Sequence, residues 1–229
     1  MTKETIKALY FDLDHTLWDF ETNSALAFKS LFEEYEIGLD LKQFLEVYIP
    51  NNNLYWKRYR VGEIDKETLR FERLKTVFDA LNYQASAAFI DELSDAYIQA
   101  LPEYNTLFEG AIEMLTALKP HYALHVITNG FQDVQHFKMK NSGLLPFFDT
   151  VTDASSVGVK KPDPQIFSHA LKVGQVAPKE ALMIGDNLEA DIEGALAVGM
   201  HAVHFMPLTK KYSQQYKEIE NLSELDFLL

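Results

Sequence analysis

The spacing of hydrophobic residues divides the chain into a first strand, a long helical stretch and an alternating remainder. Residues 6–11 form an apolar segment rich in strand formers, long enough for a buried parallel strand and too short for an independent helix. From residue 20 to about residue 101 the apolar positions recur at helical spacing, and no strand is expected there. The expected helices are 20–35, 41–59, 66–81 and 85–101, with breaks at residues 50–53, 62–65 and 82–83.

From residue 109 onward, helical and strand patterns alternate. Strands are predicted over residues 123–128, 150–152, 181–184 and 202–205, and helices over residues 111–118, 133–142, 165–173 and 189–198. One or two short helices are predicted to close the fold after residue 210. This alternation indicates an α/β fold with a Rossmann-like parallel sheet core, helices on both faces of the sheet and an inserted all-helical domain.

Composition and charge limit the function classes. The 229 residues are 47% hydrophobic and 24% charged, which is ordinary for a folded globular protein. No apolar segment has the length of a membrane span or resembles a signal peptide, and the absence of cysteine excludes disulfides, thiolate metal sites and a cysteine nucleophile. The net charge of −13 disfavours polymeric nucleic acid and membranes as partners. We therefore expect a cytoplasmic protein, and the charge still allows a small phosphorylated substrate at a local positive site. The expected oligomeric state is a monomer or homodimer.

Two aspartates, Asp12 and Asp14, follow the first predicted strand directly. Their spacing of two residues places both side chains on the same side of an extended chain. Two carboxylates at the end of a buried strand repel each other unless a cation lies between them or one of them is protonated. The pair therefore suggests a divalent metal site or acid/base chemistry, although residues 12–16 alone could equally form a turn that caps the next helix.

Further polar residues follow the later strands. Thr128 and Asn129 end the second strand, followed by a glycine that lets backbone N–H groups point at a ligand. A helix starting at Pro164 and capped by Asp163 would fix a lysine on the loop before it, either Lys160 or Lys161. Each motif alone could be an ordinary turn or a solvated loop.

The fourth predicted strand ends in Gly185 and Asp186, and Asp191 follows five residues later. Asp186 alone could be a helix cap. In open parallel sheets, however, ligands bind beyond the carboxyl ends of the strands. Because polar motifs follow four strands or their adjoining loops in one α/β pattern, we expect them to form one site.

In this order, the four motifs resemble those of the haloacid dehalogenase-like (HAD) superfamily. They are residues 12–16, 128–129, 161–164 and 185–191, and the resemblance covers the chain from about residue 8 to residue 205. It implies a catalytic core of residues 1–17 and 103–229 and a helical cap of residues 18–102 that sets substrate specificity. It also implies a phosphatase that uses Mg²⁺ and acts on a small phosphate ester.

The chemistry implied for the aspartate pair is nucleophilic. No thiol and no adjacent Ser–His pair is present, so a carboxylate is the credible nucleophile. In the family the first aspartate attacks phosphorus, which implies an aspartyl-phosphate on Asp12. Asp14 would protonate the leaving alkoxide and then deprotonate the hydrolytic water. Because a halide leaves without a proton, and the dehalogenases lack an acid here, Asp14 favours phosphate-ester hydrolysis over dehalogenation.

The resemblance assigns the remaining site residues. Thr128, the Asn129 amide and Lys161 would neutralise the phosphoryl oxygens, and Lys161 is preferred over Lys160 because the family lysine abuts the proline. The expected metal-site residues are Asp12, Asp14 through its backbone carbonyl, Asp186 and Asp191, the last anchoring Lys161 or the metal's water ligands. His15 could be a structural or a substrate contact, and the other histidines are expected to be structural.

Three aromatic residues next to these motifs, Trp18, Phe20 and Phe131, could stack on a planar substrate. Within the superfamily, the chain resembles the branch that includes small bacterial pyrimidine 5′-nucleotidases, in residues 11–21, 127–131 and 135–144. This resemblance makes a nucleoside 5′-monophosphate the leading substrate. The alternatives are a sugar-phosphate or phosphoglycolate phosphatase, a phosphotransferase such as a phosphomutase, and a non-catalytic phosphate-binding domain. A dinucleotide oxidoreductase is excluded because no G-x-G-x-x-G follows a predicted strand.

Overall fold

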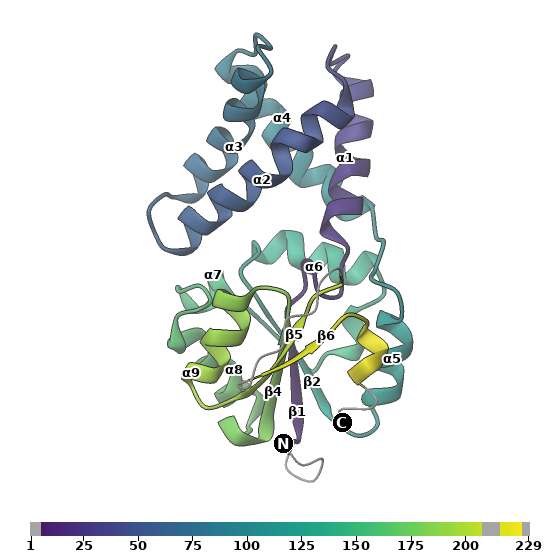
Figure 1. The fold of residues 1–229 in the computed structure, drawn as a ribbon, viewed down its shortest axis with the longest axis vertical. Coiled ribbons are helices and arrows are strands. Elements are labelled where there is room, and N and C mark those ends of the chain that lie inside the picture. Colours follow the sequence, from purple (N-terminus) through teal and green to yellow (C-terminus); the bar gives the residue numbers. More distant parts are fainter. Residues whose placement is uncertain (1–5, 208–215, 226–229) are drawn as a thin grey trace. The chain divides into compact units, whose positions relative to one another are not determined.

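The chain forms two compact units, each with its own core (Figure 1). The computed structural model describes residues 6–207 and 216–225. The sheet unit comprises Met1–Phe20 and Asn105–Leu229, and the helical unit comprises Glu21–Tyr104. The expected α/β class, with a parallel sheet and a separate helical insert, is confirmed. Within the described ranges, every helix is too short or too polar to cross a membrane.

The sheet unit is built on six strands, each parallel to its neighbours, in the order β3-β2-β1-β4-β5-β6. The central strand β1 is buried along its whole length and pairs Phe11 with Val126 on one side and Ile184 on the other. This register aligns the carboxyl ends of the neighbouring strands. The bounds are β1 (Ala8–Phe11), β2 (Ala123–Thr128), β3 (Thr150–Asp153), β4 (Ala181–Gly185), β5 (His201–Phe205) and β6 (Lys217–Ile219).

Helices cover both faces of this sheet (Figure 1). On one face, α8 (Pro164–Gly174) and α9 (Gly194–Ala197) pack Ile166, Phe167 and Ala195 against Tyr10 and Met183 of the strands. The other face is covered by α5 (Ala111–Leu118). The remaining segments of the unit are α6 (Gln132–Asn141), α7 (Ala154–Val157), the π-helical η4 (Leu188–Glu193) and the 3₁₀ turns η2 (Leu145–Phe147), η3 (Pro178–Glu180) and η5 (Leu222–Glu224).

The prediction of one or two short closing helices in the tail is wrong at residues 217–219, where a strand forms, and holds for one short 3₁₀ helix over residues 222–224. Lys217–Ile219 forms strand β6, and Leu222–Glu224 forms a single 3₁₀ turn. Residues 208–215 and 226–229, on which the prediction also fell, lie outside the described residues. Strand β6 exists because Lys217 pairs with Val203 of β5, and a three-residue strand is too short to show a period of its own.

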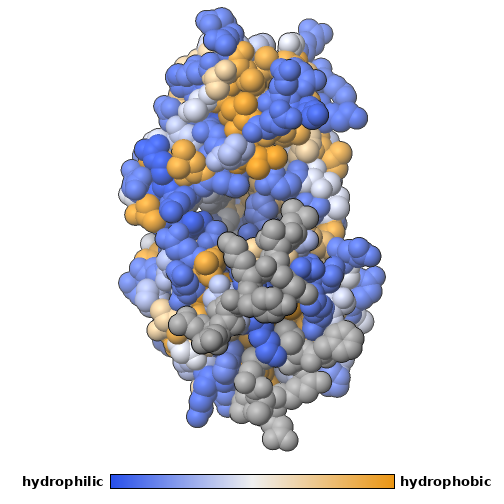
Figure 2. Space-filling view, in the orientation of Figure 1, coloured by the Kyte–Doolittle hydropathy of each residue, from blue (hydrophilic) through white to orange (hydrophobic). Residues whose placement is uncertain are grey.

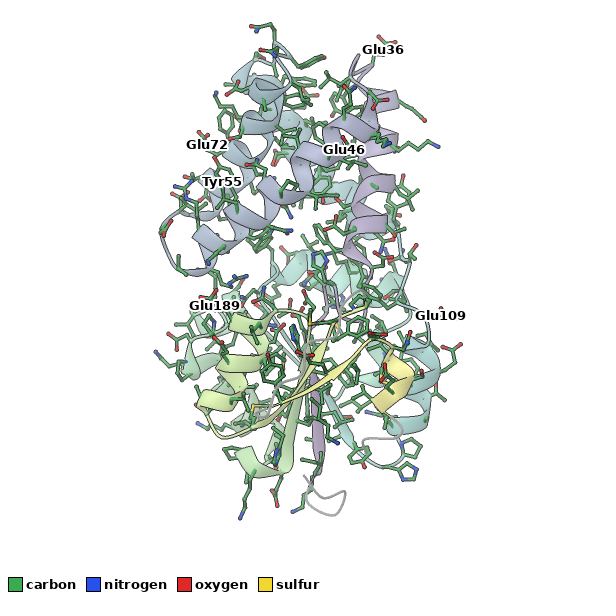
Figure 3. The ribbon with its side chains drawn as sticks, in the orientation of Figure 1. Glu36, Glu46, Tyr55, Glu72, Glu109 and Glu189 are labelled. Atoms are coloured by element: carbon green, nitrogen blue, oxygen red, sulfur yellow. The ribbon has the colours of Figure 1, made fainter. Side chains whose placement is uncertain are left out.

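The helical unit consists of α1 (Phe20–Glu34), whose first residue belongs to the sheet unit, α2 (Leu41–Arg60), α3 (Lys66–Ala80), α4 (Ala87–Ala100) and the 3₁₀ turn η1 (Leu101–Glu103). Aromatic rings fill its core, with Phe28 stacked on Tyr97 at 4.4 Å between ring centroids and edge-on to Tyr48 at 4.6 Å. Acidic side chains such as Glu36 and Glu46 lie on its exposed surface (Figure 3). The face drawn in Figure 2 mixes hydrophilic and hydrophobic residues on this unit.

The predicted break at residues 50–53 is also wrong, because α2 continues through Pro50. Two hydrogen bonds to α3 hold this part of the helix. The Asn51 side chain donates to the carbonyl of Arg73 at 2.7 Å, and the buried Asn52 side chain accepts from the Arg73 guanidinium at 3.0 Å. A proline in a helix interior costs about 3 kcal/mol, which packing against α3 offsets here.

Candidate active site

Three carboxylates meet at the carboxyl edge of the sheet. Asp12 follows β1, Asp186 follows β4 and Asp191 lies in η4, and one oxygen from each lies within 4.8 Å of the others. Asp12 is 8% exposed and Asp191 is 1% exposed. The structure therefore brings the aspartates of the first and fourth motifs together.

The approach of Asp191 depends on a glycine. A Cβ atom on Gly185 would lie 2.4 Å from Oδ2 and 2.6 Å from Cβ of Asp191. The same Oδ2 accepts a hydrogen bond from the backbone N–H of Asn187 at 3.0 Å, and the Asn187 side chain caps η4 by accepting from Ala190 N–H at 2.9 Å. The turn after β4 thus brings a carboxylate directly against the end of the strand.

Lys161 supplies the positive charge of the cluster. Its ammonium is buried and lies 2.5 Å from Oδ1 of Asp12 and 2.7 Å from Oδ1 of Asp191. The third contact of Nζ is a hydrogen bond to the carbonyl of Ile127 at 2.7 Å. Lys161 Nζ thus donates hydrogen bonds to Asp12 and to the Ile127 carbonyl, and its contact with Asp191 is an ion pair.

The loop that carries this lysine is fixed at two points. The Asn129 side chain accepts from the backbone N–H of Lys161 at 2.7 Å and donates to its carbonyl at 3.0 Å. Helix α8 begins at Pro164 with Asp163 as its cap, as predicted, and Asp163 accepts from Gln165 N–H at 2.8 Å. Lys161 occupies the side-chain oxygen of Asn129 and one of its two Nδ2 hydrogens. The second Nδ2 hydrogen and the backbone N–H are therefore the Asn129 donors that could contact a phosphoryl group.

The cluster carries an excess of negative charge. Burial raises the pKa of Asp12 well above its usual range, Asp191 and Asp186 add to the shift, and Lys161 opposes it. Burial and the nearby Asp191 raise the pKa of Asp186 to about 8, again against Lys161. Although burial lowers the pKa of Lys161, the attraction of Asp12 and Asp191 raises it above its ordinary value. Three carboxylates against one ammonium leave two uncompensated charges when all are ionised.

This donor set fits a divalent cation of the Mg²⁺ type. All three side chains offer hard carboxylate oxygens, which Mg²⁺ prefers, and the excess charge matches its own. Asp186 is further held by Thr16, whose hydroxyl donates to Oδ1 at 3.3 Å, and by His204 Nε2, 2.7 Å from its backbone carbonyl. A carbonyl only accepts, so Nε2 of His204 carries the proton.

The carboxylate of Asp14 has a different set of partners. Its Oδ1 lies 2.6 Å from the ammonium of Lys138, and its Oδ2 accepts from Nε2 of Gln135 at 2.8 Å. Burial raises the pKa of Asp14, but the charge and hydrogen bond of Lys138 and the hydrogen bond of Gln135 outweigh it and hold the pKa below its ordinary value. The sequence analysis does not identify Gln135 and Lys138 as site residues. The available signal is that they lie three residues apart, on one face of the helix predicted after the Thr128 motif.

Thr128 belongs to the same network. Its Oγ1 accepts from Gln135 Nε2 at 2.7 Å and from Gly130 N–H at 3.1 Å. Both lone pairs are thereby occupied, so the hydroxyl proton of Thr128 is left to donate. The three predicted phosphate-binding residues, Thr128, Asn129 and Lys161, thus lie together with the two aspartates of the first motif.

Among the aromatic residues expected near the substrate, two contact Lys138. Its ammonium lies 4.1 Å from the ring centroid of Trp18 and 5.2 Å from that of Phe20, and the Trp18 side chain is fully buried. His15 packs on Phe20 with ring centroids 4.9 Å apart. Phe131 is half-buried at the start of α6. Stacking of these rings on a substrate stays a prediction.

The chain is similar over most of its length to known hydrolases. A family profile described as haloacid dehalogenase-like hydrolase matches residues 6–199. The pyrimidine 5′-nucleotidase YjjG of Escherichia coli is 31% identical over 193 residues, 84% of this chain and 82% of that protein. The pyrimidine 5′-nucleotidase PynA of Streptococcus pneumoniae is 30% identical over 206 residues, 88% of this chain and 84% of that protein.

Solved structures share the fold. The HAD-hydrolase YfnB of Bacillus subtilis, solved with bound magnesium, is 28% identical with a TM-score of 0.88, covering 97% of this chain and 98% of that one. A 2-haloacid dehalogenase of Pseudomonas syringae pv. Tomato is 26% identical with a TM-score of 0.65 over 97% of each chain, so the fold alone does not decide which bond is cleaved. With the profile matching most of its length, the chain is an enzyme of the haloacid dehalogenase-like hydrolase family.

Proposed function

We propose that the chain is a Mg²⁺-dependent phosphomonoester hydrolase that works through an aspartyl-phosphate on Asp12. The observation that carries this proposal is the pair of carboxylates two residues apart in different surroundings. Asp12 lies in the cluster with Lys161, Asp186 and Asp191, whereas Asp14 is bound by Gln135 and Lys138. Two carboxylates in distinct environments suit two distinct roles, a nucleophile and a proton carrier.

In the first step, a carboxylate oxygen of Asp12 forms a bond to phosphorus while the bond from phosphorus to the leaving oxygen breaks. Lys138 and Gln135 lower the pKa of Asp14 in the free protein. Asp14 must therefore take up a proton as the phosphate dianion binds beside it, because the nearby negative charge favours the neutral carboxyl, and it then gives this proton to the leaving oxygen. The ammonium of Lys161 and the hydroxyl of Thr128 stabilise the phosphoryl oxygens. In the second step Asp14 takes a proton from water, whose oxygen bonds to phosphorus as the bond between phosphorus and the Asp12 oxygen breaks and frees the carboxylate.

The metal would be held by the carboxylates of Asp12 and Asp186 and by the backbone carbonyl of Asp14, with Asp191 orienting Lys161 and the surrounding water. When bound, Mg²⁺ would offset the excess negative charge of the cluster and admit a phosphate dianion beside Asp12. Asp14 also argues against dehalogenation, because a halide leaves without needing a proton.

For the substrate we propose a nucleoside 5′-monophosphate. The support is the similarity to two proteins described as pyrimidine 5′-nucleotidases, together with Phe131 at the start of α6, which follows the Thr128 loop. The helical unit is proposed as the cap that selects the leaving group. Sugar phosphates and phosphoglycolate are the rival substrates, and phosphotransfer is the rival reaction.

The experiment that tests this proposal is phosphate release from a panel of nucleoside monophosphates, sugar phosphates and phosphoglycolate, with Mg²⁺ and with EDTA. We expect release that requires Mg²⁺ and the highest kcat/KM for a pyrimidine nucleotide. A sugar phosphate that surpasses every nucleotide by a wide margin would replace the substrate. No release from any ester by the folded protein would refute the hydrolase and favour phosphotransfer or a binding domain.

The glycine that admits Asp191 gives a second prediction. In Gly185→Ala the new methyl group would overlap the Asp191 carboxylate and push it out of the cluster. Because misplacement of a catalytic group by about 1 Å costs about 100-fold, we expect kcat/KM to fall by about that factor. Gly38→Ala is the matched control, since a Cβ there meets nothing within 4 Å. Steady-state kinetics and thermal melts of both variants check this, and unchanged kinetics for Gly185→Ala would refute it.

A further inference from the structure

We propose that Gln135 and Lys138 of α6 are positioning residues that hold Asp14 for proton transfer to the leaving oxygen. The inference rests on the proposed phosphatase function and deepens it. Neither residue lies in the carboxylate cluster, and both are almost fully buried, at 1% and 2% exposed. A buried amide and a buried ammonium both contact one carboxylate, which supplies the partner that makes their burial tolerable.

The geometry fixes the plane of the Asp14 carboxylate. Lys138 contacts Oδ1 at 2.6 Å and Gln135 contacts Oδ2 at 2.8 Å, so each oxygen has its own donor. A carboxylate held through one oxygen can still rotate about its Cβ–Cγ bond, whereas two donors on different oxygens prevent this rotation. Gln135 and Lys138 lie three residues apart and therefore on one face of α6, which makes a single rigid element the source of both contacts.

Gln135 also couples Asp14 to Thr128. Its Nε2 has two hydrogens, and it lies 2.8 Å from Asp14 Oδ2 and 2.7 Å from Thr128 Oγ1. The same amide therefore orients the proton carrier and leaves the threonine hydroxyl to donate to a phosphoryl oxygen. Gly130 makes room for it, because a Cβ there would lie 2.2 Å from Gln135 Nε2.

Lys138 is held in its turn by aromatic rings. The ring centroids of Trp18 and Phe20 lie 4.1 Å and 5.2 Å from its ammonium, which limits its motion and attracts its charge. Trp18 and Phe20 therefore support the lysine that faces Asp14.

The test compares two probes whose leaving groups need a proton to different degrees. p-Nitrophenyl phosphate releases a stable phenolate and needs little protonation, whereas uridine 5′-monophosphate releases an alkoxide that needs it. The readout is kcat/KM, which reports on steps up to loss of the leaving group and not on later hydrolysis of the aspartyl-phosphate. For Lys138→Met and for Gln135→Met we expect kcat/KM to fall about 100-fold on uridine 5′-monophosphate, within the range for general acid catalysis. On p-nitrophenyl phosphate we expect a change of less than about five-fold for Lys138→Met. Gln135→Met also loses the contact with Thr128, so its kcat/KM should fall further on this probe, but by less than on the nucleotide.

Controls separate this role from a structural one. Lys140→Met, an exposed lysine of the same helix, should match the wild type on both probes. Lys138→Arg, which keeps the charge, should recover part of the loss on the nucleotide. An equal fall on both probes would overturn the inference, and Gln135→Met decides it if Lys138→Met does not fold. If the wild type releases phosphate from neither probe, the proposed function fails instead.

Discussion

Replacing Asp12 with asparagine is expected to abolish phosphate release while leaving the protein folded. Asparagine keeps the size of the side chain but cannot form the bond to phosphorus. Loss of a covalent nucleophile in a concerted catalytic set reduces kcat by about 10⁴-fold or more. The measurement is phosphate release at saturating Mg²⁺ beside Asp91→Asn, an exposed aspartate of the helical unit. Activity of Asp12→Asn above one hundredth of the wild type would rule Asp12 out as the nucleophile, by the same reasoning.

The same variant should be at least as stable as the wild type in EDTA, increasingly so at higher pH. Burial, Asp191 and Asp186 raise the pKa of Asp12, so its ionised form is disfavoured in the folded state. The stability that this group contributes is therefore present below its ordinary pKa and lost as pH rises through the raised one. Asparagine has no proton to lose, so the difference in Tm should grow with pH. Mg²⁺ should reverse the order, because it stabilises the wild type more than the variant.

Melting curves of Asp12→Asn and the wild type from pH 6 to pH 9, with EDTA and with Mg²⁺, check this prediction for stability. A variant less stable than the wild type at every pH in EDTA would show that the ion pair with Lys161 outweighs the repulsion from Asp186 and Asp191. The charge balance inferred for the cluster would then be wrong, although the role of Asp12 as nucleophile would stand on the activity measurement alone.

The parts of the site that sequence reasoning could predict are those that the backbone itself positions. Asp12 and Asp186 directly follow two strands that pair in register, so a correct strand prediction brings them together before any side chain is placed. Lys161 follows for a similar reason, because Asp163 and Pro164 start α8 and fix the loop before it. In each case one local rule and the parallel sheet determine the position.

The parts that could not be predicted depend on contacts between distant segments. His204 reaches the carbonyl of Asp186 because β4 and β5 pair with Gly185 opposite His204, and this register is not visible in either segment. Gln135 and Lys138 reach Asp14 only because of where α6 lies on the sheet. The periodicity of apolar residues shows that a helix has a buried face, but it does not show which side chains of other segments that face contacts.

Replacing Lys161 with methionine is expected to have the largest combined effect on activity and stability. Its ammonium contacts Asp12, Asp191 and the Ile127 carbonyl, all in buried surroundings. Removing one partner of a buried ion pair costs about 3–5 kcal/mol, because the other charge stays buried without compensation. Loss of a donor to the phosphoryl oxygens should also lower kcat by about 100- to 1,000-fold.

The adjacent lysine provides the matched control. Lys160→Met changes the same residue type one position earlier, where the side chain is half-buried, whereas the ion pairs to Asp12 and Asp191 come from Lys161. We expect it to keep nearly full activity. Because Lys161→Met leaves the cluster with three carboxylates and no ammonium, its Tm should rise more steeply with Mg²⁺ concentration than that of the wild type. Thermal melts across a Mg²⁺ titration measure this, and a greater loss of activity in Lys160→Met would assign the phosphate contact to the other lysine.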